Sequence, residues 1–230
     1  LPRLQLHAPG MPVLSIPPRS AATQTVRVWN DAVPAFDEGE PASDWLTRFL
    51  IDAQSAHLPT PLRLVRFDER HARASSAQWC QGHASLNRFS DGFPILVVSQ
   101  ASLAELNTRL AQQGEAAVDL RRFRPNLVLA GLEETRWMAH DEDRVDRLHI
   151  QTPQGPVVLL PVKPCPRCPI PDIDPDRATT HPAVSQTLQR YRQDARVNGA
   201  ITFGINALPL QGIGSSLALG QTVQADWAFG

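Results

Sequence analysis

The segment from Lys163 to Pro175, KPCPRCPIPDIDP, constrains the fold more than any other part of this sequence, because five of its thirteen residues are proline. Proline fixes its own φ and disfavours helical backbone in the residue before it, so the segment is extended or turned. It follows an apolar run, residues 156–162, that predicts a buried strand. We therefore expect a stiff loop that holds the thiols of Cys165 and Cys168 at the end of a strand, which suits a soft metal or a redox step.

Short apolar segments, separated by many of the 21 prolines and 13 glycines, make up much of the rest of the chain. Their patterns predict strands at residues 4–8, 25–29, 61–67, 93–98, 123–130, 145–150, 156–162, 201–210 and 221–227. Three helices are expected: one capped by Ser43, one opened by the capping box Ser102-x-x-Glu105, and one that starts at Pro182. Because strands outnumber helices, the sequence predicts a mainly β fold with a few helices, built as a β-barrel.

Composition argues against several classes of function. The net charge is −1, from 22 basic and 23 acidic residues, so electrostatics give no reason to expect a nucleic-acid or acidic-membrane partner. No apolar run approaches the roughly 18 residues of a membrane span, and residues 1–6 do not resemble a signal peptide. Three cysteines are too few, and odd in number, for a disulfide scaffold, so a reducing, cytoplasmic setting is expected.

The cysteines by themselves leave the chemistry open. A structural zinc site needs a second pair of ligands, but no further His or Cys follows His181. A thioredoxin-like pair opens a helix, which the flanking prolines disfavour, and four-thiolate iron–sulfur clusters need one cysteine more than the chain has. The simplest alternative makes Cys165 and Cys168 small buried residues. Cys80 is expected to be an incidental thiol in a polar surface loop, residues 68–82.

Five motifs change this balance when they are taken together and in order. They are Asp91-Gly-Phe-Pro94, SQASLAELN at 99–107, RFRPN at 122–126, PCPRC at 164–168 with Asp174-Pro175, and FGIN at 203–206. In this order and spacing they resemble the MOSC family, and within it the amidoxime-reducing molybdenum enzymes and their bacterial counterparts. The resemblance covers residues 81–230 as the MOSC domain. Residues 1–80 look like the remainder of the companion N-terminal β-barrel domain.

The resemblance implies a molybdenum cofactor, Mo-molybdopterin. In the family the second cysteine of the pair is the protein ligand of molybdenum, and here that catalytic position is Cys168. The positions that resemble those holding the pterin and its phosphate are Asp91, Arg124, Asn126, Arg167 and Asn206. Arginine suits phosphate because its fork donates two parallel bonds, and Asp and Asn suit the polar edges of a pterin.

The implied reaction is two-electron oxygen-atom transfer, by which an N-hydroxylated compound such as an amidoxime is reduced and water is released. The electrons are expected to come from another protein, because the sequence ends at Gly230 without the ferredoxin domain that some bacterial relatives carry. A separate reductase or ferredoxin-like partner is therefore implied.

Three departures from the family pattern are visible. The family's N-terminal Lys-Ser pair and arginine have no match because the sequence starts at Leu1, so a processed or truncated N-terminus is expected. Pro171 and Asp172 stand where relatives often have two threonines, which is expected to place a carboxylate near the metal. Cys165 has no role in the pattern, and we expect it to be buried.

Two other functions remain open at this point. One is a carrier, in which Cys168 holds a persulfide or the chain passes molybdopterin to other enzymes, as MOSC domains attached to cofactor sulfurases suggest. The other is a non-catalytic barrel without cofactor, which the missing N-terminal segment favours. Metal content and the state of the Cys168 sulfur distinguish the three functions.

Overall fold

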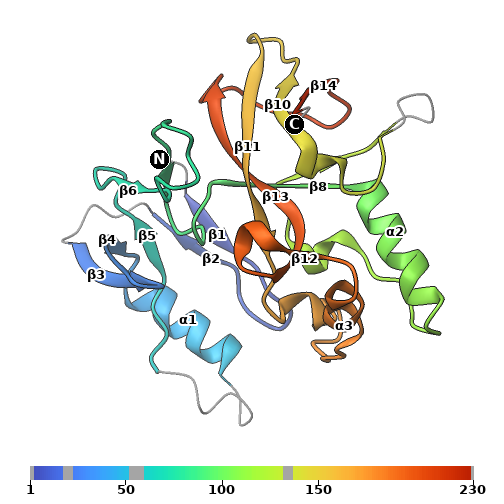
Figure 1. The fold of residues 1–230 in the computed structure, drawn as a ribbon. Coiled ribbons are helices and arrows are strands. Elements are labelled where there is room, and N and C mark those ends of the chain that lie inside the picture. Colours follow the sequence, from blue (N-terminus) through green and yellow to red (C-terminus); the bar gives the residue numbers. More distant parts are fainter. Residues whose placement is uncertain (1–2, 18–22, 52–59, 132–136, 229–230) are drawn as a thin grey trace. The chain divides into compact units, whose positions relative to one another are not determined.

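The computed structural model describes residues 3–17, 23–51, 60–131 and 137–228. The chain divides into two compact units, which can be followed by colour in Figure 1. The N-terminal unit comprises Leu1–Arg73 with Arg88–Asp91, and the C-terminal unit comprises Ala74–Asn87 with Gly92–Gly230. Each unit is described by itself.

The N-terminal unit contains two small antiparallel sheets and one helix in its described residues. Strands β1 (Leu4–Leu6) and β2 (Leu14–Ile16) pair with each other. Strands β3 (Thr23–Val28), β4 (Asp31–Asp37) and β5 (Val65–Phe67) form a three-stranded sheet in that order. The predicted strands at 4–8, 25–29 and 61–67 are therefore present, each shorter or shifted by a few residues.

Helix α1 (Glu40–Leu50) begins before the predicted cap at Ser43, so that prediction is wrong. Gly39 precedes the helix with a φ of 93°, and no side chain caps it. Ser43 lies inside the helix and is buried. Trp45 is also buried, and its indole N–H donates to the carbonyl of Pro12 at 2.6 Å, which fixes α1 to the connection between β1 and β2.

The C-terminal unit is built on one seven-stranded sheet. Its strands are β8 (Ile95–Ser99), β9 (Leu127–Leu129), β10 (Val145–Ile150), β11 (Val157–Pro166), β12 (Gln193–Asp194), β13 (Ala200–Gln211) and β14 (Val223–Trp227). Their order is β14-β10-β11-β13-β8-β9, with β12 paired to β13; β8 and β9 run parallel and the other neighbours antiparallel. The short strands β6 (Arg73–Ala74) and β7 (Leu86–Asn87) pair with each other. With three α-helices in the described residues, the predicted mainly β fold is confirmed.

Strands β11 and β13 are the longest in the sheet, and Figure 1 shows both as strongly bent ribbons. Their register shifts after Val158, Pro161 and Pro164. Proline has no N–H to donate, so it is tolerated in a sheet at such irregularities, and bulges bend the strand that carries them. The strand therefore runs to Pro166, beyond its predicted end at residue 162, and the stiff loop is shorter than expected.

The core of the C-terminal unit lies on both faces of this sheet. Val97 belongs to a cluster with residues of β9, β10, β11 and β13, while its neighbour Val98 packs with Phe203 and with the helices α2 (Gln100–Ala111) and α3 (Ala183–Gln189). Successive strand residues point to opposite faces, so two adjacent valines join two different clusters. Strand β8 is thus buried on both sides.

Helix α2 also starts earlier than the capping box predicts. Its N-cap is Ser99, whose hydroxyl accepts from the N–H of Ser102 at 3.1 Å. The hydroxyl of Ser102 donates instead to the carboxylate of Glu142 at 2.6 Å, and Glu105 pairs with Arg109 one turn further along. The predicted box from Ser102 to Glu105 is therefore wrong, because a buried tertiary partner takes the hydroxyl of Ser102.

Cys80 is not the surface thiol that was expected. It is 3% exposed and packs with Leu160 of β11 and Leu208 of β13. Burial raises the pKa of its thiol. The polar composition of residues 68–82 conceals this contact, because a single small apolar side chain is enough to anchor a loop on a sheet.

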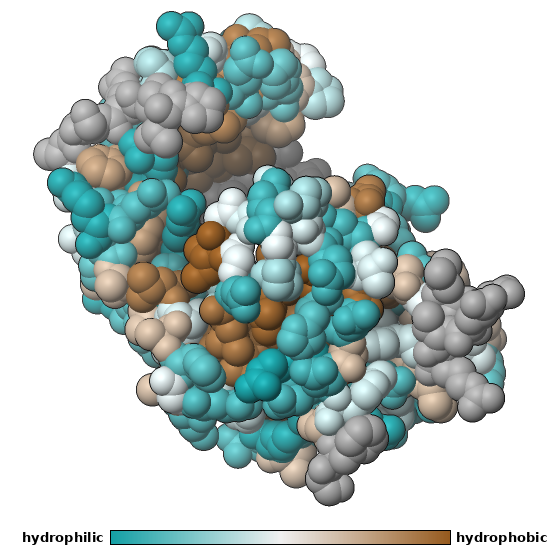
Figure 2. Space-filling view, turned by 90° about the horizontal axis from the view of Figure 1, so that it is seen from above, coloured by the Kyte–Doolittle hydropathy of each residue, from teal (hydrophilic) through white to brown (hydrophobic). Residues whose placement is uncertain are grey.

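Hydrophilic side chains predominate on the face shown in Figure 2, where hydrophobic ones reach the surface in patches. The most exposed large hydrophobic residues include Ile213 and Leu219, in the connection from β13 to β14. Single exposed hydrophobic side chains of this kind are ordinary on protein surfaces and do not indicate a binding site. In the described part of the chain, no helix has both the length and the apolar composition that crossing a membrane requires.

Candidate functional site

The two cysteines of the proline-rich segment have different environments. Cys165 lies near the end of β11 and is half-buried, whereas Cys168 lies two residues beyond the strand and is exposed. Between them, the backbone N–H of Arg167 donates to the carbonyl of Ile201 at 2.9 Å. The segment is therefore held to the start of β13 as far as the residue next to Cys168. The expected full burial of Cys165 is not observed.

The guanidinium of Arg167 joins the cysteine segment to the segment before β9. Its Nη1 donates to the Sγ of Cys165 at 3.2 Å, and its Nη2 donates to the carbonyl of Phe123 at 2.9 Å. Its Cζ lies 5.4 Å from the centroid of the Phe123 ring. Its Nε is buried and has no hydrogen-bond partner in the described residues. Both arms of the fork thus contact protein atoms, and one buried N–H stays unpaired.

This contact brings Arg124 close to Arg167, because Phe123 and Arg124 share a peptide bond. Phe123 is fully buried, and its ring stacks on Phe203 at a centroid distance of 4.0 Å, so the peptide is firmly placed. Arg124 ends the 3₁₀ helix η1 (Leu120–Phe123) with a φ of 55°, in the left-handed region. Its side chain is exposed and makes no hydrogen bond or ion pair within the described residues. Arg124 is therefore a free cation on the residue that follows the carbonyl bound by Arg167.

Two further arginines fasten the same two segments together. Arg121 donates from both Nη atoms to the carboxylate of Asp176, at 2.8 and 2.6 Å, and these bonds lower the pKa of Asp176. Arg122 donates to the carbonyl of Pro171 and to the carboxylate of Asp174, both at 3.2 Å. The sequence assigned no role to these residues, because nothing in it signals that partners about fifty positions apart meet.

Asn126 and Asn206 lie on either side of Leu96 in the sheet. Asn206 on β13 stands opposite Leu96 on β8 and opposite Lys163 on β11. Asn126, just before β9, donates its N–H to the carbonyl of Leu96 at 2.9 Å and accepts the N–H of Leu96 on its side-chain oxygen at 2.8 Å. Since neighbouring strands are about 4.8 Å apart, the two asparagine backbones are about 10 Å apart.

Both asparagines keep part of their hydrogen-bonding capacity. The side-chain amide of Asn206 donates to the carbonyl of Lys163 at 3.2 Å, which leaves its oxygen without a partner in the described residues. The side-chain oxygen of Asn126 accepts from the N–H of Leu96, and its side-chain NH₂ group has no hydrogen-bond partner in the described residues. One acceptor and one donor are thus available on this row of the sheet.

Asp91 belongs to the N-terminal unit and is therefore described apart from the cysteine segment. Its carboxylate accepts from the indole N–H of Trp29 at 3.0 Å. Its backbone carbonyl accepts from Arg73 at 2.9 Å. Of the six predicted site residues, Arg167, the chain neighbour of Cys168, binds the carbonyl of the residue that precedes Arg124. Asn126 and Asn206 lie on one row of the same sheet, and Asp91 belongs to the other unit.

Asp172 has a structural partner. It is 4% exposed, and its carboxylate accepts from the N–H of Ser185 at 2.9 Å, in the first turn of α3. The residue before that helix, Pro182, has no side chain that can cap it. The carboxylate of Asp172 caps the helix instead, from another part of the chain. Its proximity to a metal stays a prediction, whereas its capping bond explains its burial.

The described residues contain no group of three or more His, Cys, Asp or Glu side chains that could hold a metal ion by themselves. A zinc ion bound only by such side chains therefore has no candidate site there. One contact that the sequence did not anticipate lies nearby: the ammonium of Lys163 sits 5.3 Å from the ring of Trp79 and 5.8 Å from the ring of Phe93. Paired aromatic faces attract a cation, which fixes this lysine.

Similarity to known proteins agrees with the motifs. The family model for the MOSC domain matches residues 85–224. The chain is 34% identical over 200 residues to "Mitochondrial amidoxime reducing component 2" of Bos taurus, covering 82% of the chain and 52% of that protein. It is also 34% identical over 183 residues to "Mitochondrial amidoxime-reducing component 1" of Homo sapiens, covering 76% of the chain and 47% of that protein. The chain spans about half the length of the curated relatives it matches.

Proposed function

The chain belongs to the MOSC domain family, and on that premise we propose that it is a molybdenum-cofactor-dependent reductase of N-hydroxylated compounds with Cys168 as the protein ligand of the metal. The names of its relatives support the reaction class, since they describe components that reduce amidoximes. The overall change takes up two electrons and two protons, breaks the N–O bond of the substrate and releases water.

The observation that carries the proposal is the difference between the two thiols. Cys165 already accepts a hydrogen bond from Arg167 at 3.2 Å. Cys168 is exposed and has no such partner among the described residues. A cofactor that enters from solution must reach the sulfur that binds it, so this difference favours Cys168 over Cys165.

The residues of the C-terminal unit fit a phosphate-bearing pterin. Arg124 offers an unpaired, exposed guanidinium, which suits phosphate. Asn126 offers a side-chain NH₂ and Asn206 a side-chain oxygen, which suit the polar edges of a pterin. Arg167 has a single unpaired N–H left, at Nε. Its main role in the proposal is therefore to position Phe123, and with it Arg124, beside Cys168.

When bound, the molybdenum cofactor supplies the two-electron oxygen-atom-transfer chemistry. The protein's own residues would hold the cofactor and orient it. Cys168 presents its sulfur at the end of a segment that Arg167 and Ile201 keep in place. Arg121 and Arg122 keep the segment that follows Cys168 attached to the one that carries Arg124. For Asp91 the proposed role in holding the cofactor rests on the family motif alone.

The remaining expectations stay proposals for this chain. Residues 1–80 are proposed to belong to an N-terminal β-barrel domain and residues 81–230 to the MOSC domain. The presence of two compact units supports a division into two parts, with residues 74–80 in the C-terminal unit and residues 88–91 in the N-terminal one. A separate reductase or ferredoxin-like protein is proposed as the electron donor, and the word "component" in the relatives' names supports it. A cytoplasmic, reducing setting is proposed from the three free cysteines, although the relatives are named mitochondrial.

Metal analysis tests the proposal. Protein expressed in a host that makes the molybdenum cofactor is expected to contain about one molybdenum per chain. The Cys168→Ser variant is expected to lose it, and the Cys165→Ser variant is the matched control that keeps it. With an artificial reductant, the loaded protein is expected to convert an amidoxime to the amidine. The Cys168→Ser variant is expected to show no such conversion.

The same preparations distinguish the alternatives. A persulfide on Cys168 without molybdenum, seen by mass spectrometry of the intact protein, contradicts the reductase and supports a sulfur carrier. If folded protein from a host that loads other molybdenum enzymes contains neither metal nor persulfide, the result supports a barrel that binds no cofactor. Molybdenum that persists in the Cys168→Ser variant contradicts the assigned ligand.

A further inference from the structure

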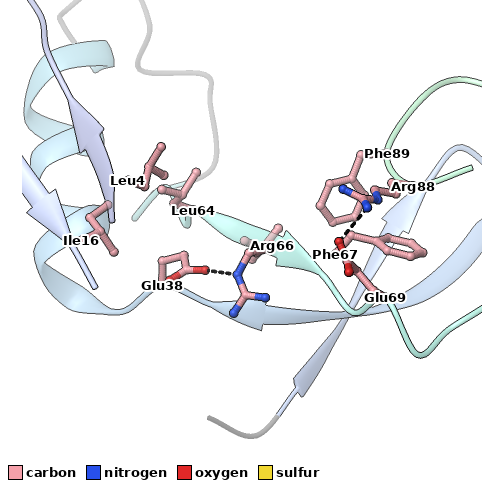
Figure 3. A pocket seen from close by; sticks show the side chains of 10 residues that line it. Leu4, Ile16, Glu38, Leu64, Arg66, Phe67, Glu69, Arg88 and Phe89 are labelled. Carbon is pink, nitrogen blue, oxygen red and sulfur yellow. Dashed lines mark hydrogen bonds and ion pairs between the residues drawn. The ribbon is translucent and has the colours of Figure 1, made fainter. Parts of the chain in front are cut away.

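Lys163 is the only lysine among the 22 basic residues of the sequence, and all the others are arginines. Many of those arginines neutralise a carboxylate of the protein. In the pocket of the N-terminal unit shown in Figure 3, for example, Arg66 pairs with the buried Glu38 and Arg88 pairs with Glu69. Lys163 differs from them, because its ammonium makes no hydrogen bond or ion pair in the described residues.

Two aromatic rings hold this ammonium in place, and all three residues belong to the C-terminal unit. The Nζ of Lys163 lies 5.3 Å from the ring centroid of Trp79 and 5.8 Å from that of Phe93. The attraction of a cation to aromatic faces fixes the charge but gives its three N–H groups no acceptor. Lys163 is half-buried and its Nζ keeps contact with solvent, so a ligand can reach it.

Lys163 lies on the same face of the sheet as Asn206. The two residues stand opposite each other on β11 and β13, and the side-chain amide of Asn206 donates to the carbonyl of Lys163 at 3.2 Å. Leu208 follows Asn206 by two residues, which places it on the same face, and it belongs to the cluster against which Phe93 packs. The rings that hold Lys163 therefore border the row that contains the two asparagines.

This row crosses the sheet from Asn126 through Leu96 and Asn206 to Lys163. With neighbouring strands about 4.8 Å apart, its two ends are about 14 Å apart. Along this length the protein offers an unpaired NH₂ donor, an unpaired acceptor oxygen and an ammonium, in that order. Arg124, two residues before Asn126, adds an unpaired cation at the other end. Such a row suits an elongated, flat, anionic molecule with polar edges.

We propose that Lys163 is an anion-binding residue of the cofactor site, whose ammonium contacts an anionic oxygen carried by the pterin. This role rests on the proposed function and adds to it a residue that lies outside the five sequence motifs. Five positions separate Lys163 from Cys168, so their Cα atoms are at most about 18 Å apart, a distance that a ligand lying along the row can bridge. A lysine suits the task, because its compact ammonium is a point charge that can donate in several directions.

Two pterins that differ by one negative charge test this role: pterin-6-carboxylate and 6-methylpterin. In calorimetric titrations of metal-free protein at pH 6.5, the carboxylate is expected to bind about tenfold more tightly. Reductive methylation with ¹³C-formaldehyde labels the single lysine and keeps its positive charge. The NMR signal of Lys163 is expected to shift with the carboxylate, and its absence from the Lys163→Arg variant distinguishes it from the signal of the N-terminal amine.

Three variants make the test specific. Lys163→Met removes the charge and is expected to bring the affinity for pterin-6-carboxylate down to that for 6-methylpterin. Lys163→Arg keeps the charge and is expected to keep most of the preference. Arg190→Met, at an exposed position, changes the net charge as much as Lys163→Met does and is expected to leave the preference unchanged. If Lys163→Met does not fold, the two affinities and the response of the Lys163 signal in the unmodified chain decide.

Retention of molybdenum is a second readout, and it does not depend on activity. During dialysis of loaded protein, Lys163→Met is expected to lose molybdenum about tenfold faster than the unmodified chain or Arg190→Met. If the unmodified chain contains molybdenum and Lys163→Met retains it equally well, the role of Lys163 is contradicted and the proposed function stands. If the unmodified chain contains none, the proposed function fails and the pterin probes alone decide. Equal affinities of the two probes, or a preference that persists in folded Lys163→Met, overturn the role of Lys163.

Discussion

The guanidinium of Arg167 lies 3.2 Å from the sulfur of Cys165 and 2.9 Å from the carbonyl oxygen of Phe123. One side chain thereby connects the end of β11 with the segment that leads into β9. The contact occupies the first thiol of the Cys-Pro-Arg-Cys sequence and leaves the second, Cys168, exposed. The different roles proposed for the two cysteines follow from this one arginine.

Alkylation rates are expected to separate the three thiols. Cys168 is exposed, Cys165 is half-buried, and Cys80 is 3% exposed with a pKa raised by burial. Since the reagent needs an accessible thiolate, Cys168 is expected to react about tenfold or more faster than Cys80, with Cys165 between them. Peptide mass spectrometry after timed treatment of metal-free protein with iodoacetamide measures the order. Cys80 reacting as fast as Cys168 would contradict the burial described for it.

Arg167 and Arg124 are expected to differ in their effect on stability. Arg167→Ala removes the bond to the Phe123 carbonyl and leaves that buried acceptor unpaired, so the free energy of unfolding is expected to fall by about 1–3 kcal/mol. Arg124→Ala is the control, because its exposed side chain has no partner in the described residues, and it is expected to stay within about 0.5 kcal/mol. Urea titration measures both. Equal losses in the two variants would show that the contact of Arg167 contributes nothing specific.

Gly204 and Gly199 form a matched pair for testing the packing of β13. Their φ values are 76° and 74°, so a Cβ strains the two backbones alike, by about 1–2 kcal/mol. A Cβ at Gly204 would lie 2.6 Å from a methyl group of Val98 and 2.7 Å from the carbonyl oxygen of Val97, whereas at Gly199 it would meet nothing within 4 Å. Gly204→Ala is therefore expected to lower the free energy of unfolding by about 2 kcal/mol more than Gly199→Ala. Similar losses measured by thermal or urea unfolding would contradict the close approach of β13 to β8.

Acid is expected to destabilise the C-terminal unit through His140. Burial is the main reason why its pKa is lowered to about 4, and the charge of Arg192 adds to the effect, although Nε2 lies only 3.3 Å from the carboxylate of Glu105. The unfolded chain binds this proton near pH 6.5, so the contribution of neutral His140 is complete above that pH and is lost as the pH falls from about 6.5 to about 4. The loss amounts to at most about 3 kcal/mol.

The variant His140→Phe is expected to flatten this part of the stability profile, measured as urea midpoints between pH 3.5 and pH 7.5. His83→Phe, at an exposed position, is the control and is expected to keep the slope. Glu142 works in the opposite direction, because burial raises its pKa and its contribution is lost as the pH rises. An unchanged slope in His140→Phe would assign the acid sensitivity to other groups.

Local patterns in the sequence were sufficient for much of the fold. The strand at Val145–Ile150 was predicted with its observed ends, and the helix after Pro182 begins where proline allows. Apolar periodicity reports which side chains can be buried, and proline and glycine restrict the backbone locally. Both signals act over a few residues, so they are readable without the partner segment.

The errors occurred where a distant partner replaced a local one. Ser102 looked like a helix cap, but Glu142, forty positions away, takes its hydroxyl. Cys80 looked like a surface residue in a polar loop, but it packs on Leu160 and Leu208. Asp172 gives a related case without an error: its expected proximity to a metal stays a prediction, and the structure adds that it caps a helix through the N–H of Ser185.

The sequence by itself determined the mainly β fold, the family, and the segment that carries Cys165 and Cys168, because these depend on short-range patterns and on the order of motifs. Only the tertiary structure decided which of the two sulfurs is free, which arginine is unpaired, and that a buried carboxylate lines a pocket in the N-terminal unit. Each of those facts depends on which atom of one segment lies within about 3 Å of another. Spacing along the chain does not contain that information, because folding brings together residues that are tens of positions apart.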